Sequence, residues 1–208
     1  MSSHYEIAND LLSIGAVKIS PNDPFTWTSG IKSPIYCDNR LTMSYPEIRK
    51  RISSAFKQLV ETMEEQPDVI AGCATAGIPH AAWLAGQLDL PMVYVRSKPK
   101  AHGKGNQIEG QITPGRRVIV IEDLISTGGS SLQAAQALQD EGFIVLGVAA
   151  IFSYGLPQAT QNFDSQGLAL HTITNFDILV GMLAETQKIT AQEKHSLLEW
   201  RNGFTAPL

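Results

Sequence analysis

Two adjacent acids precede a run of hydroxyl and glycine residues in the middle of the chain. An apolar stretch, Val118–Ile121, leads into Glu122, Asp123, Leu124, Ile125, Ser126, Thr127, Gly128, Gly129 and Ser130. Carboxylates accept hydrogen bonds from sugar hydroxyls or hold a hydrated metal ion. Hydroxyls, glycines and amides at a helix N-terminus favour a phosphate monoester. Each part alone is also typical of a strand end or a helix cap, whereas their order predicts a sugar-phosphate site.

A basic segment lies shortly before the acids. Arg96, Lys98, Lys100, His102 and Lys104 fall within nine residues, in a chain whose 16 Lys and Arg face 20 Asp and Glu. A net charge of −4 argues against duplex nucleic acid or an anionic membrane as the main partner. A solvated surface would explain the cluster, but its place at a predicted strand end favours closure over a bound polyphosphate.

Short β-branched runs alternate with helical patterns, which predicts an α/β fold. Nearly continuous apolar runs indicate parallel strands covered on both faces, at 69–73, 91–96, 117–122 and 143–152. Helical patterns occupy 4–12, 44–65, 79–88, 130–141 and 191–200. Between the predicted strands, residues 97–116 form a long segment without apolar periodicity, which is typical of a functional loop.

Two other functional classes are disfavoured by the sequence. Gly72 and Gly77 have the glycine spacing of a nucleotide-binding P-loop, but Ile78 and Pro79 stand where Lys and Ser or Thr are needed. Val69–Leu88 is long and uncharged, yet its glycines and Pro79 favour a buried strand, turn and helix over a membrane span.

The two cysteines match no disulfide or zinc spacing, and a secretory signal pattern is missing from 1–20, so we expect a cytoplasmic protein.

The acidic strand and its Thr-Gly loop resemble the type I phosphoribosyltransferases. The resemblance implies a central, mainly parallel sheet flanked by helices, with a small N-terminal hood. It also implies that residues 122–130 hold the ribose and its 5′-phosphate, and that the turn after the first core strand contacts pyrophosphate. Thr75, Ala76 and Gly77 match that turn.

The basic segment narrows the resemblance to the orotate phosphoribosyltransferase family. Arg96, Lys100 and His102 match its flexible loop, as do residues 108–110. Many relatives carry a lysine where Ser97 stands, and Lys98 is a candidate to replace it. In that family the loop acts in trans, so the resemblance implies a homodimer in which residues 96–110 reach the neighbouring subunit.

The N-terminal stretch 25–36 resembles the hood of the same family. The resemblance implies a hood over residues 1–40, with a contribution from the C-terminus, on a core over 41–208 that is effectively one domain. Tyr36, Trp27 or Lys32 could contact a flat anionic pyrimidine, although aromatic residues are as often part of a core. Tyr154 stands near a position where other members carry an arginine for orotate.

The resemblance implies transfer of ribose 5-phosphate from 5-phosphoribosyl 1-pyrophosphate (PRPP) to N1 of orotate, in de novo UMP biosynthesis. Arg96, Lys100, His102 and Asp123 are the expected catalytic residues, Glu122 binds the ribose with Asp123, and Ser126 also touches orotate. Mg²⁺ is expected to bind mainly through PRPP, with no ligand set from the protein. Two alternatives remain open: a purine or uracil salvage phosphoribosyltransferase, and a regulator that binds PRPP without turnover.

Overall fold

A six-stranded sheet forms the centre of the molecule. The computed structural model describes residues 3–26, 32–98 and 107–204. Neighbouring strands are parallel except at the β6–β7 edge. The order across the sheet is β10 (Leu170–Asn175), β9 (Ile144–Ser153), β8 (Arg117–Ile125), β5 (Val69–Cys73), β6 (Met92–Val95) and β7 (Ile108–Glu109).

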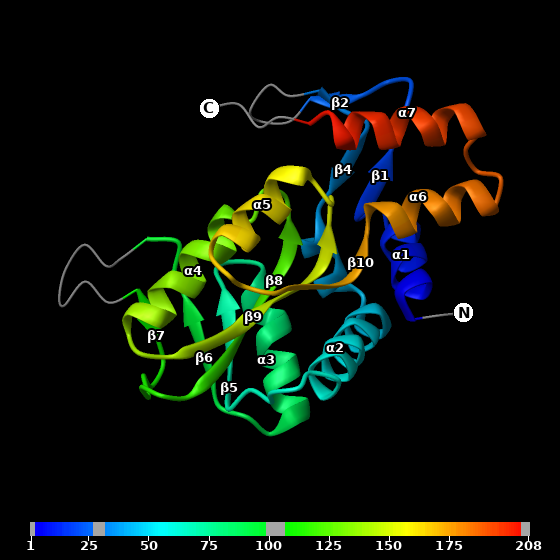
Figure 1. The fold of residues 1–208 in the computed structure, drawn as a ribbon. Coiled ribbons are helices and arrows are strands. Elements are labelled where there is room, and N and C mark those ends of the chain that lie inside the picture. The colour runs from blue at the N-terminus through cyan, green and yellow to red at the C-terminus, as the bar shows by residue number, and fades with distance from the viewer. Residues whose placement is uncertain (1–2, 27–31, 99–106, 205–208) are drawn as a thin grey trace.

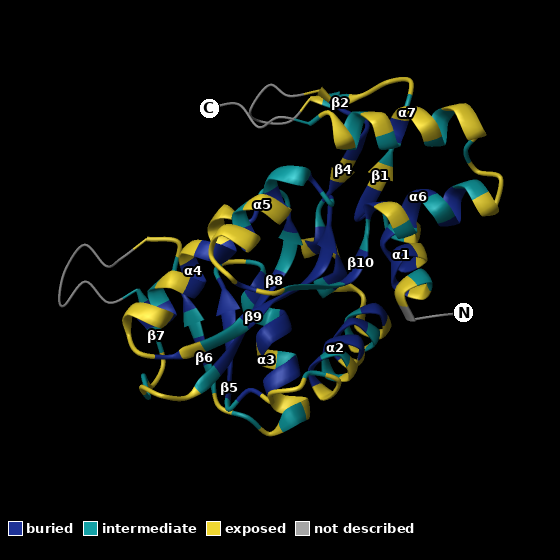
Figure 2. Cartoon of the chain, viewed as in Figure 1, coloured by how far each residue is buried: buried dark blue, intermediate teal, exposed yellow. Residues whose placement is uncertain are grey.

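Helices cover both faces of this sheet (Figure 1). In β8, Ile119 and Ile121 join one apolar cluster, and Val118 and Val120 join the other. This alternation explains why the strand reads as a continuous apolar run, because both of its faces are buried (Figure 2). The first cluster includes side chains from α1 (Ser3–Ser13), α2 (Pro46–Glu61), α3 (Gly77–Leu88) and α6 (Phe176–Glu185), and the second includes side chains from α4 (Gly129–Asp140) and α5 (Pro157–Ser165).

The predicted α/β class is confirmed, and the four predicted strands are β5, β6, β8 and β9. β8 runs three residues beyond the predicted end, because Leu124 and Ile125 continue its pairing with β9. The sequence patterns missed β7, β10, α5 and α6, and also four short strands within residues 17–37. β7 lies inside the segment expected to lack structure, and a two-residue strand is too short to show a period.

The N-terminal strands stand at one end of the sheet and meet the C-terminal helix. β1 (Val17–Ile19) pairs with β4 (Ile35–Cys37), and β2 (Phe25–Thr26) pairs with β3 (Lys32–Ser33), both antiparallel. α7 (Ala191–Asn202) lies against this group, where the Trp200 indole N–H donates to the Lys32 carbonyl oxygen at 3.3 Å. The first and last parts of the chain therefore form one local structure (Figure 1).

His80 is a buried histidine at the packing of α3 against α2. Its side chain is 1% exposed and lies beside the rings of Phe56 and Trp83. Burial lowers the pKa of His80 to about 4, from an ordinary value near 6.5. The imidazole is therefore neutral in the folded protein over most of the physiological pH range.

We predict that His80 makes the fold acid-sensitive. The unfolded chain binds a proton at His80 below about pH 6.5, whereas the folded chain does so only near pH 4, so folding stability falls as pH decreases through this window. From pH 7 to pH 5 the loss from this one group is about 2 kcal/mol. Urea denaturation of the wild type and of His80→Leu at both pH values measures it. An equal pH dependence in the two proteins would contradict the assignment.

Candidate active site

The predicted acids and the predicted pyrophosphate turn lie at the same edge of the sheet. β5 and β8 are parallel neighbours, with Gly72 opposite Ile121, so both carboxyl ends point the same way. Gly77, at the start of α3, is packed so closely on β8 that a Cβ there would lie 2.3 Å from the Ile121 carbonyl oxygen. The turn 74–77 is therefore held beside Glu122, and Thr75 within it is exposed.

Glu122 and Asp123 form a pair of adjacent acids at this edge. Glu122 is 6% exposed, and the Asp123 main-chain N–H donates to its Oε1 at 2.9 Å. Burial is the main cause that raises the pKa of both carboxyl groups, and the Cys73 thiol hydrogen-bonds the Glu122 carboxyl. Such a pair is stabilised in its ionised form by hydroxyl donors, which a ribose ring supplies in adjacent positions.

The loop after β8 has the geometry of an anion site. Gly128 precedes α4 with φ +82°, and a Cβ there would lie 2.5 Å from the Phe163 ring, so this position requires glycine. Gly129 and Ser130 are exposed, and Ser126 and Thr127 are partly exposed. Among the described residues, the start of α4 has no side-chain cap, so its first N–H groups are available to a phosphate.

Leu124 and Ile125, which lie between the acids and the loop, contribute differently from their neighbours. The Ile125 side chain is buried in the core, and its carbonyl oxygen accepts from the Tyr154 N–H at 3.0 Å. Leu124 packs partly against the other core cluster. These two predicted binding residues therefore anchor the strand tip, which leaves the acids and the hydroxyl loop to face a ligand.

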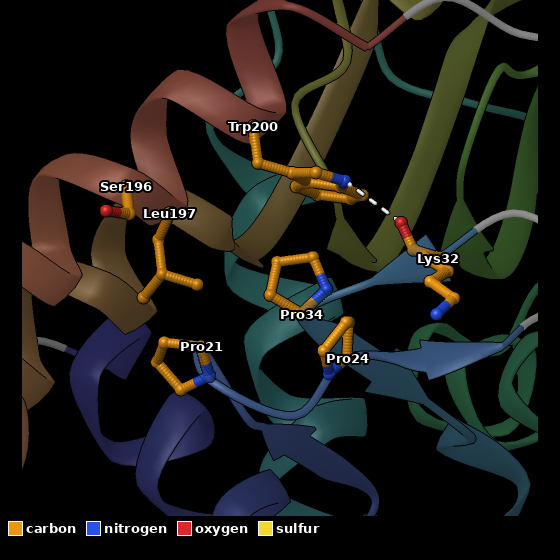
Figure 3. Close-up of a pocket in the computed structure, with 7 residues that line it drawn as sticks. All are labelled: Pro21, Pro24, Lys32, Pro34, Ser196, Leu197 and Trp200. Atoms are coloured by element: carbon orange, nitrogen blue, oxygen red, sulfur yellow. Dashed lines mark hydrogen bonds between the residues drawn. The ribbon is translucent and has the colours of Figure 1, made fainter.

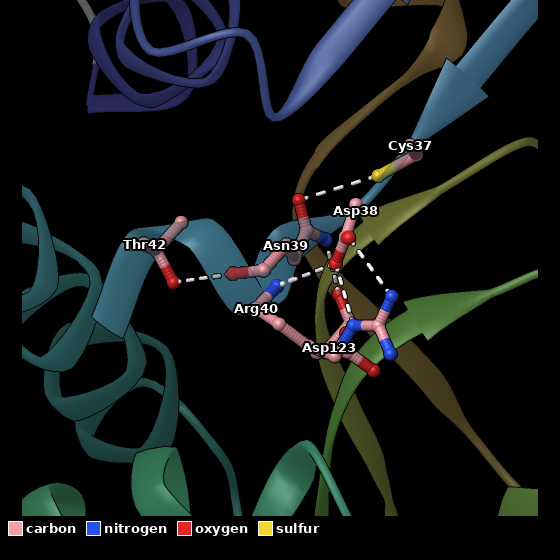
Figure 4. Close-up of polar contacts among 6 residues, drawn as sticks. All are labelled: Cys37, Asp38, Asn39, Arg40, Thr42 and Asp123. Atoms are coloured by element: carbon pink, nitrogen blue, oxygen red, sulfur yellow. Dashed lines mark hydrogen bonds and ion pairs between the residues drawn. The ribbon is translucent and has the colours of Figure 1, made fainter. Parts of the chain in front are cut away.

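A buried asparagine joins the N-terminal strands to the acids, and no pattern in the sequence indicated this contact. Asn39 follows β4 at the start of the short helix η1 (Asn39–Ser44), and its amide Nδ2 donates to the Asp123 carbonyl oxygen at 2.6 Å (Figure 4). Beside it, the Arg40 guanidinium donates two hydrogen bonds to the Asp38 carboxylate, of 2.6 and 2.8 Å. An asparagine in a turn has no distinctive pattern, and 84 residues separate it from its partner.

Two of the three aromatic candidates for the base, Tyr36 and Tyr154, are described by the structure and lie in different surroundings. Tyr36 is 40% exposed on β4, whose flanking residues Ile35 and Cys37 are buried, and its ring lies 6.0 Å from that of Phe25. Tyr154 is only 4% exposed and packs edge-on against Phe152. Tyr36 is therefore the one of the two that can meet a ligand without rearrangement.

The basic segment leaves β6 at the same edge of the sheet. Arg96 is partly exposed, and its Nη1 lies 3.8 Å from Glu109 Oε1, while its main-chain N–H donates to the Gln107 carbonyl oxygen. Lys98 is exposed. Lys100 and His102, and Trp27 of the N-terminal stretch, lie outside the described residues. The two described ends of the basic segment, at Arg96 and Gln107, therefore meet at the same edge of the sheet as the acidic pair.

An apolar cavity lies elsewhere, between the N-terminal strands and α7. It has a volume of about 260 Å³ and is walled by three prolines and Trp200 (Figure 3). Of the residues named from the sequence as candidates, Lys32 lines this cavity, whereas the acids, the turn 74–77, the hydroxyl loop and Tyr36 do not. We therefore place the site at the strand ends, where the polar groups converge. Within residues 3–26, 32–98 and 107–204, no cluster of three or more His, Cys, Asp or Glu could hold a metal ion, and no helix is long and apolar enough to span a membrane.

Comparisons with known proteins agree with this geometry. Residues 44–168 match the family model described as "Phosphoribosyl transferase domain". The chain is 58% identical to an orotate phosphoribosyltransferase of Oceanobacillus iheyensis, over 96% of this chain and 98% of that protein, and 53% identical to one of Listeria monocytogenes, over 98% and 97%. A crystal structure of orotate phosphoribosyltransferase from Aeropyrum pernix superposes with a TM-score of 0.75 at 26% identity, covering 88% of this chain and 99% of that one. The chain belongs to the orotate phosphoribosyltransferases, within the type I phosphoribosyltransferase family.

Proposed function

We propose that this chain transfers ribose 5-phosphate from PRPP to N1 of orotate, which forms orotidine 5′-monophosphate and pyrophosphate in de novo pyrimidine biosynthesis. One observation carries the proposal: the acidic pair, the turn 74–77 and the exposed hydroxyl loop meet at one edge of the sheet. Relatives that are 53–58% identical over nearly the whole chain bear the name of this activity.

Glu122 and Asp123 hold the ribose hydroxyls in this proposal, and the loop 126–130 holds the 5′-phosphate. As the bond from C1′ to pyrophosphate lengthens, the ribose gains positive charge. Two adjacent carboxylates in a buried setting stabilise that charge more strongly than they would in water. Because orotate N1 is itself the nucleophile, the reaction requires no covalent intermediate with the protein.

The leaving pyrophosphate gains negative charge in the same step. In this proposal the main-chain groups of Thr75, Ala76 and Gly77 contact it, which is supported by the close packing of Gly77 against Ile121 and Glu122. Arg96, Lys98, Lys100 and His102 supply the positive charge that compensates it in this proposal. We propose that Tyr36 and the Ser126 hydroxyl bind the orotate ring, because both residues are at least partly exposed.

Mg²⁺ fits this site as a companion of the substrate. Mg²⁺ prefers oxygen ligands and retains several waters, so one or two carboxylates and phosphate oxygens suffice. The described residues offer the acidic pair and no larger cluster of metal ligands. Asp123 and Glu122 are the residues that would approach it, and when bound with PRPP it neutralises part of the pyrophosphate charge.

We further propose a homodimer in which residues 96–110 of one subunit complete the site of the other. Leu41 and Tyr45, close in sequence to the Asn39 contact with Asp123, are large apolar residues that remain 41% and 43% exposed, as expected of residues near a contact with a second copy. We place the protein in the cytoplasm, where the buried Cys37 and Cys73 stay reduced.

We predict strict dependence of pyrophosphate release on the base. With PRPP and Mg²⁺, orotate supports release, whereas uracil, adenine and hypoxanthine do not, because the site is expected to favour an anionic pyrimidine. A coupled pyrophosphate assay with each base in turn measures this. Release with a purine or uracil would support a salvage enzyme, and PRPP binding without release would support a regulator.

Lys100→Ala is predicted to reduce kcat about a hundredfold, because one charge donor to the leaving group is lost. PRPP binding, measured by calorimetry, is expected to change much less, since the acids and the loop are intact. Lys57→Ala, on the exposed face of α2, removes one lysine without touching the site and serves as the control. Equal kcat for Lys100→Ala and Lys57→Ala would exclude the lysine from the reaction.

A mixing experiment tests the trans arrangement. Lys100→Ala and Asp123→Asn are each expected to be nearly inactive, because the first lacks the loop charge and the second lacks the ribose carboxylate. After the two proteins exchange subunits, one site of each hybrid dimer combines an intact loop with an intact acidic pair. Activity should therefore reappear on mixing. A mixture as inactive as its parts, with exchange verified by mass spectrometry, would show that the loop acts within its own subunit.

A further inference from the structure

Asn39 supplies a hydrogen-bond donor to a part of β8 that the neighbouring strand β5 no longer reaches. The pairing of β8 with β5 ends at Ile121, whereas its pairing with β9 continues to Ile125. Asp123 thus lies beyond the last β5 partner, and the Asn39 amide donates to its carbonyl oxygen at 2.6 Å. The other end of that amide, Oδ1, accepts from the Cys37 thiol at 3.2 Å, and the side chain is fully buried (Figure 4).

Asn162 makes the same contact on the phosphate side of the site. From α5, its Nδ2 donates to the Thr127 carbonyl oxygen at 2.9 Å, and its Oδ1 accepts from Gln158 Nε2 at 2.9 Å. Thr127 lies past the end of β8, so its carbonyl also has no strand partner there. Each asparagine amide is therefore held at its oxygen and directs its nitrogen to one main-chain carbonyl of the site.

Holding a carbonyl oxygen fixes a whole peptide plane. The Asp123 carbonyl belongs to the plane that follows the acidic pair, and its position determines how the Asp123 carboxylate approaches a ribose. Because Asn39 lies only two residues after the end of β4, the same bond determines how far the strand carrying Tyr36 stands from the acids. The Thr127 carbonyl belongs to the plane that includes the Gly128 N–H, at the centre of the phosphate loop.

We propose that Asn39 and Asn162 are positioning residues that align the two halves of the site separately. Asn39 sets the base-binding strand against the ribose-binding acids, and Asn162 sets the phosphate loop. The inference rests on the proposed function, since it assigns these halves to the ribose and base and to the 5′-phosphate. Loss of the Asn39 donor impairs the chemical step, whereas loss of the Asn162 donor impairs PRPP binding.

The isosteric changes Asn39→Asp and Asn162→Asp test this, because each keeps the accepting oxygen and the shape but removes the donor at neutral pH. For Asn39→Asp we expect kcat at pH 8 to fall about tenfold or more, with the PRPP KM within about twofold of wild type, since small misplacements of reacting groups are costly. For Asn162→Asp we expect the PRPP KM to rise about tenfold and kcat to change within about twofold.

A pH series separates positioning from damage to the fold. Burial raises the pKa of the new carboxyl group, and when protonated it regains an O–H donor toward the same carbonyl. The kcat of Asn39→Asp relative to wild type should therefore rise as pH falls from 8 to 5.5. For Asn39→Ala, which regains no donor, the ratio should stay flat. A flat ratio for both variants would overturn the assignment of Asn39.

Gln66→Glu is the matched control. Gln66 Nε2 also donates to main-chain carbonyls, those of Val60 and Met63 at 2.9 Å, but it lies between α2 and β5, at the opposite edge of the sheet. This change should lower the melting temperature and leave kcat and KM as in wild type. Kinetic changes in Gln66→Glu equal to those of the asparagine variants would mean that general destabilisation explains all three.

Cys37 offers a second route should Asn39→Asp fail to fold. Cys37→Ala removes the donor that orients the Asn39 oxygen, and Cys37→Ser retains a hydroxyl donor. We expect a severalfold lower kcat for the first and recovery in the second. Equal kcat in the two variants would overturn the proposal.

The same measurements distinguish a failure of the proposed function from a failure of the positioning roles of Asn39 and Asn162. Absence of orotate-dependent turnover in the wild type would refute the proposed function. Wild-type turnover with unchanged kinetics in both asparagine variants would refute only the positioning roles. Calorimetric binding of ribose 5-phosphate needs no turnover, and it should weaken in Asn162→Asp but not in Asn39→Asp.

Discussion

The site depends on close packing of α3 against β8 at Gly77. Parallel pairing of β5 and β8 brings their carboxyl ends to one edge, but only the missing Cβ at Gly77 allows the turn 74–77 to lie directly against the Ile121 carbonyl. Any side chain there would move α3 away from the sheet, and with it the turn that faces the leaving group. Backbone contact therefore determines the distance between the groups proposed to bind pyrophosphate and those proposed to bind ribose.

The second constraint is electrostatic. Glu122 and Asp123 are adjacent, mostly buried and raised in pKa by that burial, so the unliganded protein holds an unfavourable pair of acids at its strand tip. Arg40 partly offsets the charge of Asp123, while Asp38 opposes this effect. A ligand that supplies hydroxyl donors and binds together with a divalent cation reduces this unfavourable electrostatic energy. In the proposed function, PRPP and Mg²⁺ bound together would supply both.

The third constraint concerns main-chain groups at the end of a strand. β5 ends before β8 does, so carbonyls on one side of β8 lose their partners just where the chemistry is placed. Asn39, from the N-terminal part, satisfies one of these carbonyls, that of Asp123, and Asn162 of α5 satisfies the carbonyl of Thr127 just past the end of β8. Buried carbonyls without donors would be costly, which gives these contacts a structural reason as well as a proposed functional one.

The sequence by itself determined the fold class, four of the strands and the family, because apolar runs, the acids and the hydroxyl loop are local patterns in consecutive residues. The family resemblance also assigned Thr75, Ala76 and Gly77 to a pyrophosphate turn, and the parallel pairing of β5 and β8 in the structure brings that turn beside the acids. Only the tertiary structure decided that Tyr36 is exposed and Tyr154 buried, and that α7 packs on the N-terminal strands. It alone brought Asn39 to Asp123, since a hydrogen bond across 84 residues depends on where two elements meet and leaves no trace in the spacing of either.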